Sequence, residues 1–117
     1  MKYTFDNERP IYLQIVDIIT KEITNGIIKP GQKILSVREY AMEFKVNPNT
    51  ISKALMMLEN DALIITERTN GKFVTSNLEV INKHKETIIK DKINSFIEEL
   101  SQLGLSKEEV IKILKEN

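Results

Sequence analysis

The residues best suited to chemistry lie in one short stretch near the middle of the chain. Asn49, Ser52, Lys53 and Met56 stand at positions i, i+3, i+4 and i+7, which places them on one face of a helix. An Asn amide can pair with adenine, a Lys ammonium can donate to guanine, and a Ser hydroxyl can bond bases or phosphates. This spacing predicts a surface that reads the edges of DNA bases.

The elements that must position this surface begin with the helix itself. Its opposite face is apolar at the same intervals and should face a core, with Ile51, Ala54, Leu55 and Leu58. Asn47 can cap the helix and Pro48 suits its first position, so the helix is expected to begin there and to end near Glu59 or Asn60. Asn47 is open to two interpretations, a cap or a DNA contact. Capping does not explain a polar stripe that continues into the helix, so Asn49, Ser52 and Lys53 are interpreted as DNA contacts.

A shorter helix is expected just upstream, ending near Phe44. Ser36 and Glu39 form the capping-box pattern that begins it. Arg38 lies in its first turn, where a cation opposes the helix dipole. A phosphate or a base edge would recruit the cation there. The alternative is a surface salt bridge from Arg38 to Glu39 or Glu43.

The remaining elements complete a winged helix-turn-helix. A first helix is expected over residues 11–25, and two short strands over 63–66 and 72–75. The Asn-Gly pair between the strands is a hairpin-turn signal. Such a wing can reach the sugar-phosphate backbone or the minor groove, or it can be a solvated turn. The predicted wing contacts are Arg68, Asn70, Gly71 and Lys72.

The tail from Leu78 to Asn117 shows helical periodicity alone. An apolar seam recurs there at intervals of four and three residues: Ile89, Ile93, Phe96, Leu100 and Leu103. Gly104 is expected to end that helix, and Ser106 with Glu109 to begin a last short one. The tail is too short to enclose a large core. We expect it to pair with a copy of itself along the seam; the alternative is that it folds back on its own DNA-binding domain.

These elements define the expected fold class, an α+β chain that is mainly α. Residues 1–77 should form a winged helix-turn-helix DNA-binding domain, and residues 78–117 a helical hairpin used for dimerisation. The alternative function is protein contact by a winged helix without specific DNA binding. Its best support is a formal net charge of zero, from 17 Lys and Arg against 17 Asp and Glu. A local basic face can still attract DNA when the total charge is zero.

Several functional classes have no support in the sequence. The chain has no cysteine, no His/Asp/Glu group with metal-ligand spacing, and no nucleophile or phosphate-loop motif. His84 is the sole histidine and stands among charged residues, so it is interpreted as a solvated side chain. We therefore expect no enzyme, no metal site and no cofactor. No apolar run resembles a signal peptide or a membrane span, so a cytoplasmic protein is expected.

Five ordered motifs resemble the GntR family of bacterial transcription regulators. They are Pro10-Ile11-Tyr12-Leu13-Gln14-Ile15, Gly26-Ile27-Ile28-Lys29-Pro30-Gly31, Ser36-Val37-Arg38-Glu39, Val46-Asn47-Pro48-Asn49-Thr50-Ile51 and Gly71-Lys72-Phe73-Val74. The resemblance covers about residues 9–76. The Asn-Pro-Asn-Thr segment and the short helical tail are similar to the YtrA subfamily in particular.

The resemblance implies a winged-helix DNA-binding domain, a small helical dimerisation unit and no large effector domain. It also implies a repressor, often of an operon that includes its own gene and transporter genes. The implied partners are a double-stranded DNA operator and a second copy of the chain, with a small-molecule effector left open. The implied DNA contacts are Arg38, Asn47, Asn49, Thr50, Ser52 and the wing around Gly71.

The sequence departs from the family pattern at four positions. Leu35 stands where the family usually has proline, and Ala62 where it usually has glycine. In the wing, Thr69 replaces a usual glycine and Lys72 a usual threonine. These departures leave the expected fold unchanged and bear on the geometry of the wing. Lys72 adds a cation that can strengthen a phosphate contact.

Overall fold

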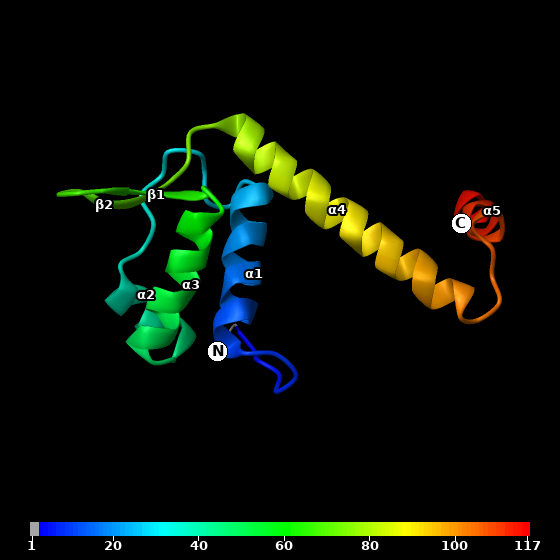
Figure 1. The fold of residues 1–117 in the computed structure, drawn as a ribbon, viewed down its shortest axis with the longest axis horizontal. Coiled ribbons are helices and arrows are strands. Elements are labelled where there is room, and N and C mark those ends of the chain that lie inside the picture. The colour runs from blue at the N-terminus through cyan, green and yellow to red at the C-terminus, as the bar shows by residue number, and fades with distance from the viewer. Residues whose placement is uncertain (1–2) are drawn as a thin grey trace. The chain divides into compact units, whose positions relative to one another are not determined.

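The computed structural model describes residues 3–117, which form five helices and one two-stranded antiparallel sheet (Figure 1). The elements follow in the order α1 (Ile11–Thr24), α2 (Val37–Phe44), α3 (Pro48–Asn60), β1 (Ile64–Glu67), β2 (Gly71–Val74), α4 (Leu78–Ser101) and α5 (Lys107–Glu116). The predicted fold class, mainly helical with a winged helix-turn-helix, is confirmed. The chain divides into two compact units, Met1–Asn82 and Lys83–Asn117.

The first unit is organised around α3, which packs against both α1 and α2 (Figure 1). The predicted apolar stripe of α3 is almost completely buried: Ile51, Ala54, Leu55 and Leu58. It meets Ile15 and Ile19 of α1 and Phe44 of α2 in one hydrophobic cluster. Burying an aliphatic side chain of this size contributes about 1.5–3 kcal/mol. The stripe therefore fixes which face of α3 is turned outward.

A three-residue turn joins α2 to α3. Lys45 ends α2 in the left-handed conformation, with φ +58°. Asn47 then begins α3, since its side-chain oxygen accepts the Asn49 N–H at 2.8 Å and Pro48 occupies the first helical position. The cap interpretation of Asn47 is confirmed.

The hairpin pairs Ile64 with Val74 and Glu67 with Gly71. The strands therefore lie within one residue of their predicted positions. A further bridge joins Lys33 to Phe73, so the loop before α2 runs along the outer edge of β2. Ala62, which replaces the family's usual glycine, has φ +62° and is exposed. The position requires a left-handed backbone, which explains why glycine would suit it.

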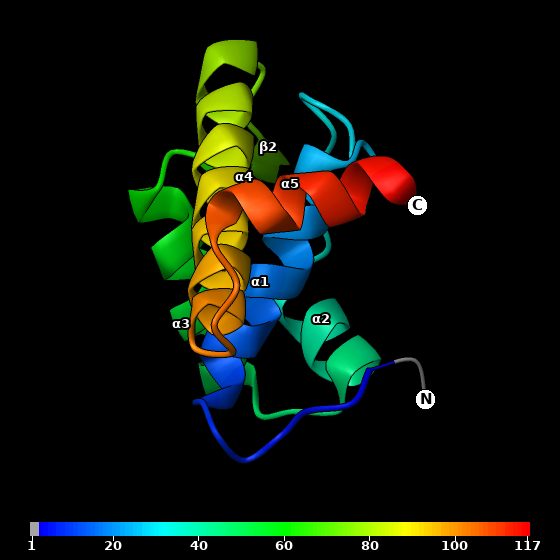
Figure 2. The same ribbon diagram turned by 90° about the vertical axis from the view of Figure 1, so that its right-hand side faces the viewer.

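The second unit consists of most of α4 and of α5, whose axis runs across that of α4 (Figure 2). Ser106 and Glu109 form the predicted capping box, and Val110 is buried. The sequence predicted that the long helix would continue to Gly104, but α4 ends at Ser101. Leu103 consequently lies in the following turn and is 75% exposed. The predicted seam is helical only as far as Leu100.

Candidate nucleic-acid interface

The outward face of α3 carries the residues predicted to read DNA. Asn49, Ser52 and Lys53 are exposed, and the Met56 side chain is 61% exposed. Thr50 is half-buried on the edge of this face. Since the opposite stripe is buried, the separation of α3 into a core face and a polar face is confirmed. The polar face offers an amide, hydroxyls and an ammonium to an external partner.

Lys53 is positioned by an aromatic ring from α1. Its Nζ lies 4.9 Å from the centroid of the Tyr12 ring, within the range of a cation–π interaction. The two residues line a hollow of about 210 Å³ together with Ile11, Asn49 and Thr50. The first turns of α1 and α3 therefore meet at the polar face. In the sequence, Tyr12 stood out only within a family motif and was not linked to Lys53, because no periodicity connects residues so far apart in the chain.

Arg38 is exposed in the first turn of α2. The Glu39 carboxylate is engaged in the capping box: its Oε1 accepts the Ser36 N–H at 2.9 Å, and these bonds to Ser36 lower the Glu39 pKa. Among the described residues, neither Glu39 nor Glu43 forms an ion pair with Arg38 within 4 Å. The alternative of a salt bridge from Arg38 to Glu39 or Glu43 is therefore not supported.

The wing presents Arg68 and Asn70 to the outside, while Lys72 is turned toward α3. Arg68, Asn70 and Gly71 are exposed, and Asn70 Nδ2 donates to Glu67 Oε2 at 3.2 Å. Lys72 Nζ donates to Glu59 Oε1 at 2.7 Å and to Thr66 Oγ1 at 2.9 Å. The Glu59 pKa is lowered by its bonds to Lys72 and Thr66. Lys72 thus ties the hairpin to the end of α3, and its predicted phosphate contact stays a prediction.

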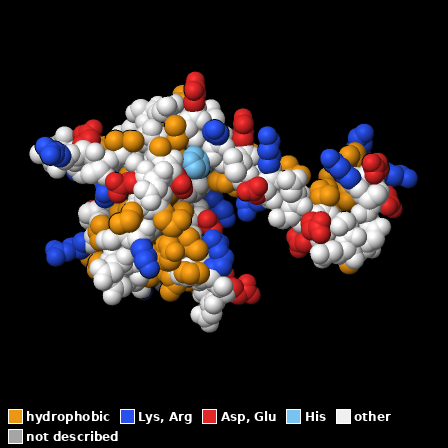
Figure 3. Space-filling model, viewed as in Figure 1, with side chains coloured by type: hydrophobic (Ala, Val, Ile, Leu, Met, Phe, Trp, Pro, Cys, Tyr) orange, Lys and Arg blue, Asp and Glu red, His pale blue; other side chains and the backbone are white. Residues whose placement is uncertain are grey.

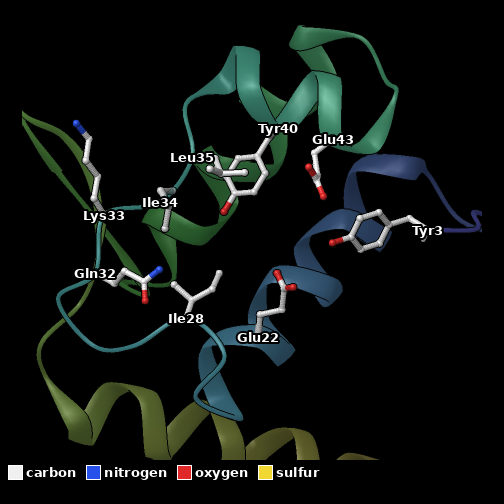
Figure 4. Close-up of a pocket in the computed structure, with 9 residues that line it drawn as sticks. All are labelled: Tyr3, Glu22, Ile28, Gln32, Lys33, Ile34, Leu35, Tyr40 and Glu43. Atoms are coloured by element: carbon white, nitrogen blue, oxygen red, sulfur yellow. The ribbon is translucent and has the colours of Figure 1, made fainter. Parts of the chain in front are cut away.

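Two further hollows flank these elements. One of about 440 Å³ separates the start of α2 from the wing tip. The other, of about 230 Å³, lies between α1, α2 and the intervening loop (Figure 4). Glu22 and Glu43 both line it; burial, and then the charge of Glu43, raise the Glu22 pKa. Burial raises the pKa of Tyr40 to about 12.

In the described part of the chain no group of three His, Asp or Glu residues is placed to hold a metal ion.

These features define the class of protein. Three helices, a capped second helix carrying a free cation, a third helix with an outward polar face and a hairpin wing form a winged helix-turn-helix for binding DNA. Cationic side chains project from the hairpin end and from the region of α2 (Figure 3). None of the described helices is long and apolar enough to span a membrane.

The chain belongs to the GntR family of bacterial regulatory proteins, whose model matches residues 11–74. It is 36% identical to the HTH-type transcriptional repressor YtrA of Bacillus subtilis over 108 residues, covering 92% of this chain and 83% of YtrA. It is similar to the structure of a GntR family transcriptional regulator from Listeria monocytogenes: TM-score 0.90, 42% identity, 97% and 99% of the two chains covered. The DNA-binding domain of AraR in complex with its operator is more distant: TM-score 0.55, 31% identity, 64% and 93% covered. The chain is a transcription regulator with a helix-turn-helix DNA-binding domain, and the predicted likeness to YtrA is confirmed.

Proposed function

We propose that the chain is a repressor that binds a palindromic operator as a homodimer. The observation that carries this proposal is the exposed polar face of α3, held outward by a buried stripe and flanked by Arg38 and the wing. YtrA is named a repressor and the AraR domain was solved on its operator, which supports the same use of this domain. Such a protein acts in the cytoplasm, where bacterial DNA lies.

The proposed DNA contacts divide by the groove that each would reach. Residues on α3 would face base edges in the major groove, and Arg38 a base or an adjacent phosphate. The wing tip would reach the backbone or the minor groove. Lys72 is an exception, because its ammonium already binds Glu59, so we assign it to holding the wing. The proposed contacts are Arg38, Asn47, Asn49, Thr50, Ser52, Lys53, Arg68, Asn70 and Gly71.

A second copy of the chain is the proposed partner of the tail, residues 78–117. Ile89, Ile93 and Phe96 stand at i, i+4 and i+7 on α4 and are 47%, 52% and 45% exposed. Such a row of large apolar side chains is costly to leave in water. Pairing α4 with its copy would cover the row and give an isologous dimer. Two α3 helices would then meet half-sites about 34–36 Å apart.

The test is selection of genomic fragments by the purified protein, repeated at two salt concentrations. Recovery of one palindromic sequence, with affinity that falls steeply as salt rises, is the expected result. The double variant Asn49→Ala with Lys53→Ala should lose the preference for that sequence. Lys21→Ala is the matched control, because it removes an exposed cation in the last turn of α1, away from the proposed interface. Selection of no preferred sequence would favour a winged helix used for protein contact.

A further inference from the structure

We propose that Lys33 binds a backbone phosphate of the DNA strand that passes between α3 and the wing. The inference rests on the proposed function and adds a contact that no sequence motif indicated. Lys33 lies in the loop before α2, in a segment without helical or strand periodicity. Its position is set by the fold.

The place for this phosphate is the groove of about 440 Å³ between the start of α2 and the wing tip. Leu35, Ser36, Val37 and Glu39 line one side, Thr69 and Asn70 the other, and Lys33 is among the lining residues. If α3 lies in the major groove and the wing reaches the adjacent minor groove, the strand between the two grooves passes between α3 and the wing. In the proposal, a phosphate of this strand lies over the start of α2. The groove is the hollow at that point.

The backbone of Lys33 is held in place by the wing. Lys33 bridges Phe73 of β2, and the next residue, Ile34, donates its N–H to the Lys72 carbonyl at 3.0 Å. This pairing makes the loop a partial third strand on the outer edge of β2. A contact made from it would move with the wing as one body.

Gly71 leaves the space through which the Lys33 side chain passes. A Cβ atom at Gly71 would lie 3.0 Å from Lys33 Cε and 3.6 Å from its Nζ. The φ of Gly71 is +104°, which also disfavours any other residue. The resemblance to the family assigned Gly71 to DNA contact. The geometry gives the glycine a second effect, which is to let an ammonium lie beside the wing.

The charge of Lys33 is available to a partner. The residue is exposed, and within the described residues no carboxylate forms an ion pair with it at 4 Å or less. Its charge contributes to lowering the pKa of Glu39, whose carboxylate accepts the neutral Ser36 N–H, but no ion pair within 4 Å joins Lys33 to Glu39. An anion entering the groove would therefore meet an unpaired ammonium.

The experiment measures the dissociation constant of the full chain for two duplexes of about 30 base pairs, at salt concentrations between about 50 and 200 mM. One duplex has random sequence and the other is recovered by the fragment selection. For Lys33→Met, the slope of log Kd against log salt should fall by about 0.9 for each bound protomer. The same relation gives an increase in Kd of about eightfold per protomer at about 0.1 M salt. The affinity for both duplexes should fall by the same factor, since a phosphate contact carries no sequence information.

Two variants make the result specific to the charge at this position. Lys33→Arg should keep the wild-type slope, and Lys21→Met, the matched loss of an exposed lysine on α1, should also keep it. A wild-type slope in Lys33→Met, with normal operator binding by the wild type, would overturn the Lys33 contact and leave the proposed regulator intact. Equal losses in Lys33→Arg and Lys33→Met would show a structural role and overturn it too. Failure of the wild type to bind either duplex would overturn both proposals.

Discussion

Because the Glu59 carboxylate binds the Lys72 ammonium, we predict that removing this carboxylate strengthens DNA binding. In the wild type the Lys72 ammonium is bonded to Glu59 and Thr66, and both members of the ion pair are about two-thirds buried. We expect Lys72→Met to change the slope of log Kd against log salt by much less than the value of about 0.9 that one phosphate contact contributes. Glu59→Gln keeps the shape of the side chain and removes the charge that retains the ammonium. The freed cation is then able to reach a phosphate beside the wing.

The size of this effect follows from counterion release. One additional phosphate contact raises the salt slope by about 0.9, so the ratio of affinities at 50 and 200 mM salt grows by about 3.5-fold per protomer. The ion pair itself contributes up to about 1 kcal/mol to the stability of the fold, which corresponds to a few degrees in Tm. Because the Glu59 pKa is lowered in the folded state, that contribution is present above the ordinary carboxyl pKa and is lost as pH falls through the folded value. Wild type and Glu59→Gln should therefore approach the same Tm in acid.

The assay is a fluorescence-anisotropy titration of the same duplex at several salt concentrations. The double variant Glu59→Gln with Lys72→Met separates the two possible sources of the gain. If the freed Lys72 is the source, the double variant returns to the wild-type slope. An unchanged slope in Glu59→Gln would refute the idea that Lys72 is held within reach of DNA. A gain that persists in the double variant would assign the effect to the lost negative charge of Glu59.

Three further predictions concern the tail and the stability of the DNA-binding unit. Phe96→Asp should convert the proposed dimer to a 13.5 kDa monomer in light scattering, and weaken operator binding by about 100-fold or more because two linked half-sites become one; an unaltered mass would exclude this face as the interface. Glu22→Gln should raise Tm at pH 7, because the raised folded-state pKa of Glu22 makes its ionisation oppose folding, and the gain should vanish below about pH 4; an equal gain at both pH values would contradict the sign. Ala62→Gly should stabilise the fold by roughly 0.5–1 kcal/mol in urea unfolding, since residue 62 has φ +62°, and a lower midpoint would count against backbone strain there.

Local patterns predicted the elements of the DNA-binding unit well. The first residues of α2 and α3 could be predicted from Ser36 and Asn47, whose side chains cap the first turns of the helices through short-range hydrogen bonds. Periodicity identified the buried face of α3, because the apolar residues from Ile51 to Leu58 recur at helical spacing and therefore all lie on one side of the helix. The bounds of each strand differ by one residue from the predicted ones, because Glu67 pairs with Gly71 and the turn between the strands is shorter than predicted.

Contacts between distant segments could not be predicted in the same way. Lys33 beside the wing, Tyr12 under Lys53 and Lys72 on Glu59 each depend on tertiary packing that leaves no periodic signal. Lys72 shows the consequence most clearly. Its type and its place near the wing tip suggested a phosphate contact, but the direction of its side chain is set by the carboxylate of Glu59 in the last turn of α3.

The same contacts explain how a chain of zero formal charge can present unpaired cations to DNA. Of two acidic residues near the proposed interface, Glu59 is paired with the Lys72 ammonium, while Glu39 bonds the neutral groups of Ser36. Lys33 and Arg38 form no ion pair among the described residues. The charge that an approaching phosphate meets is therefore set by pairing within the fold, and it differs from the sum over the sequence. Freeing Lys72 would add to this local charge, which is why its release should be visible in the salt dependence of binding.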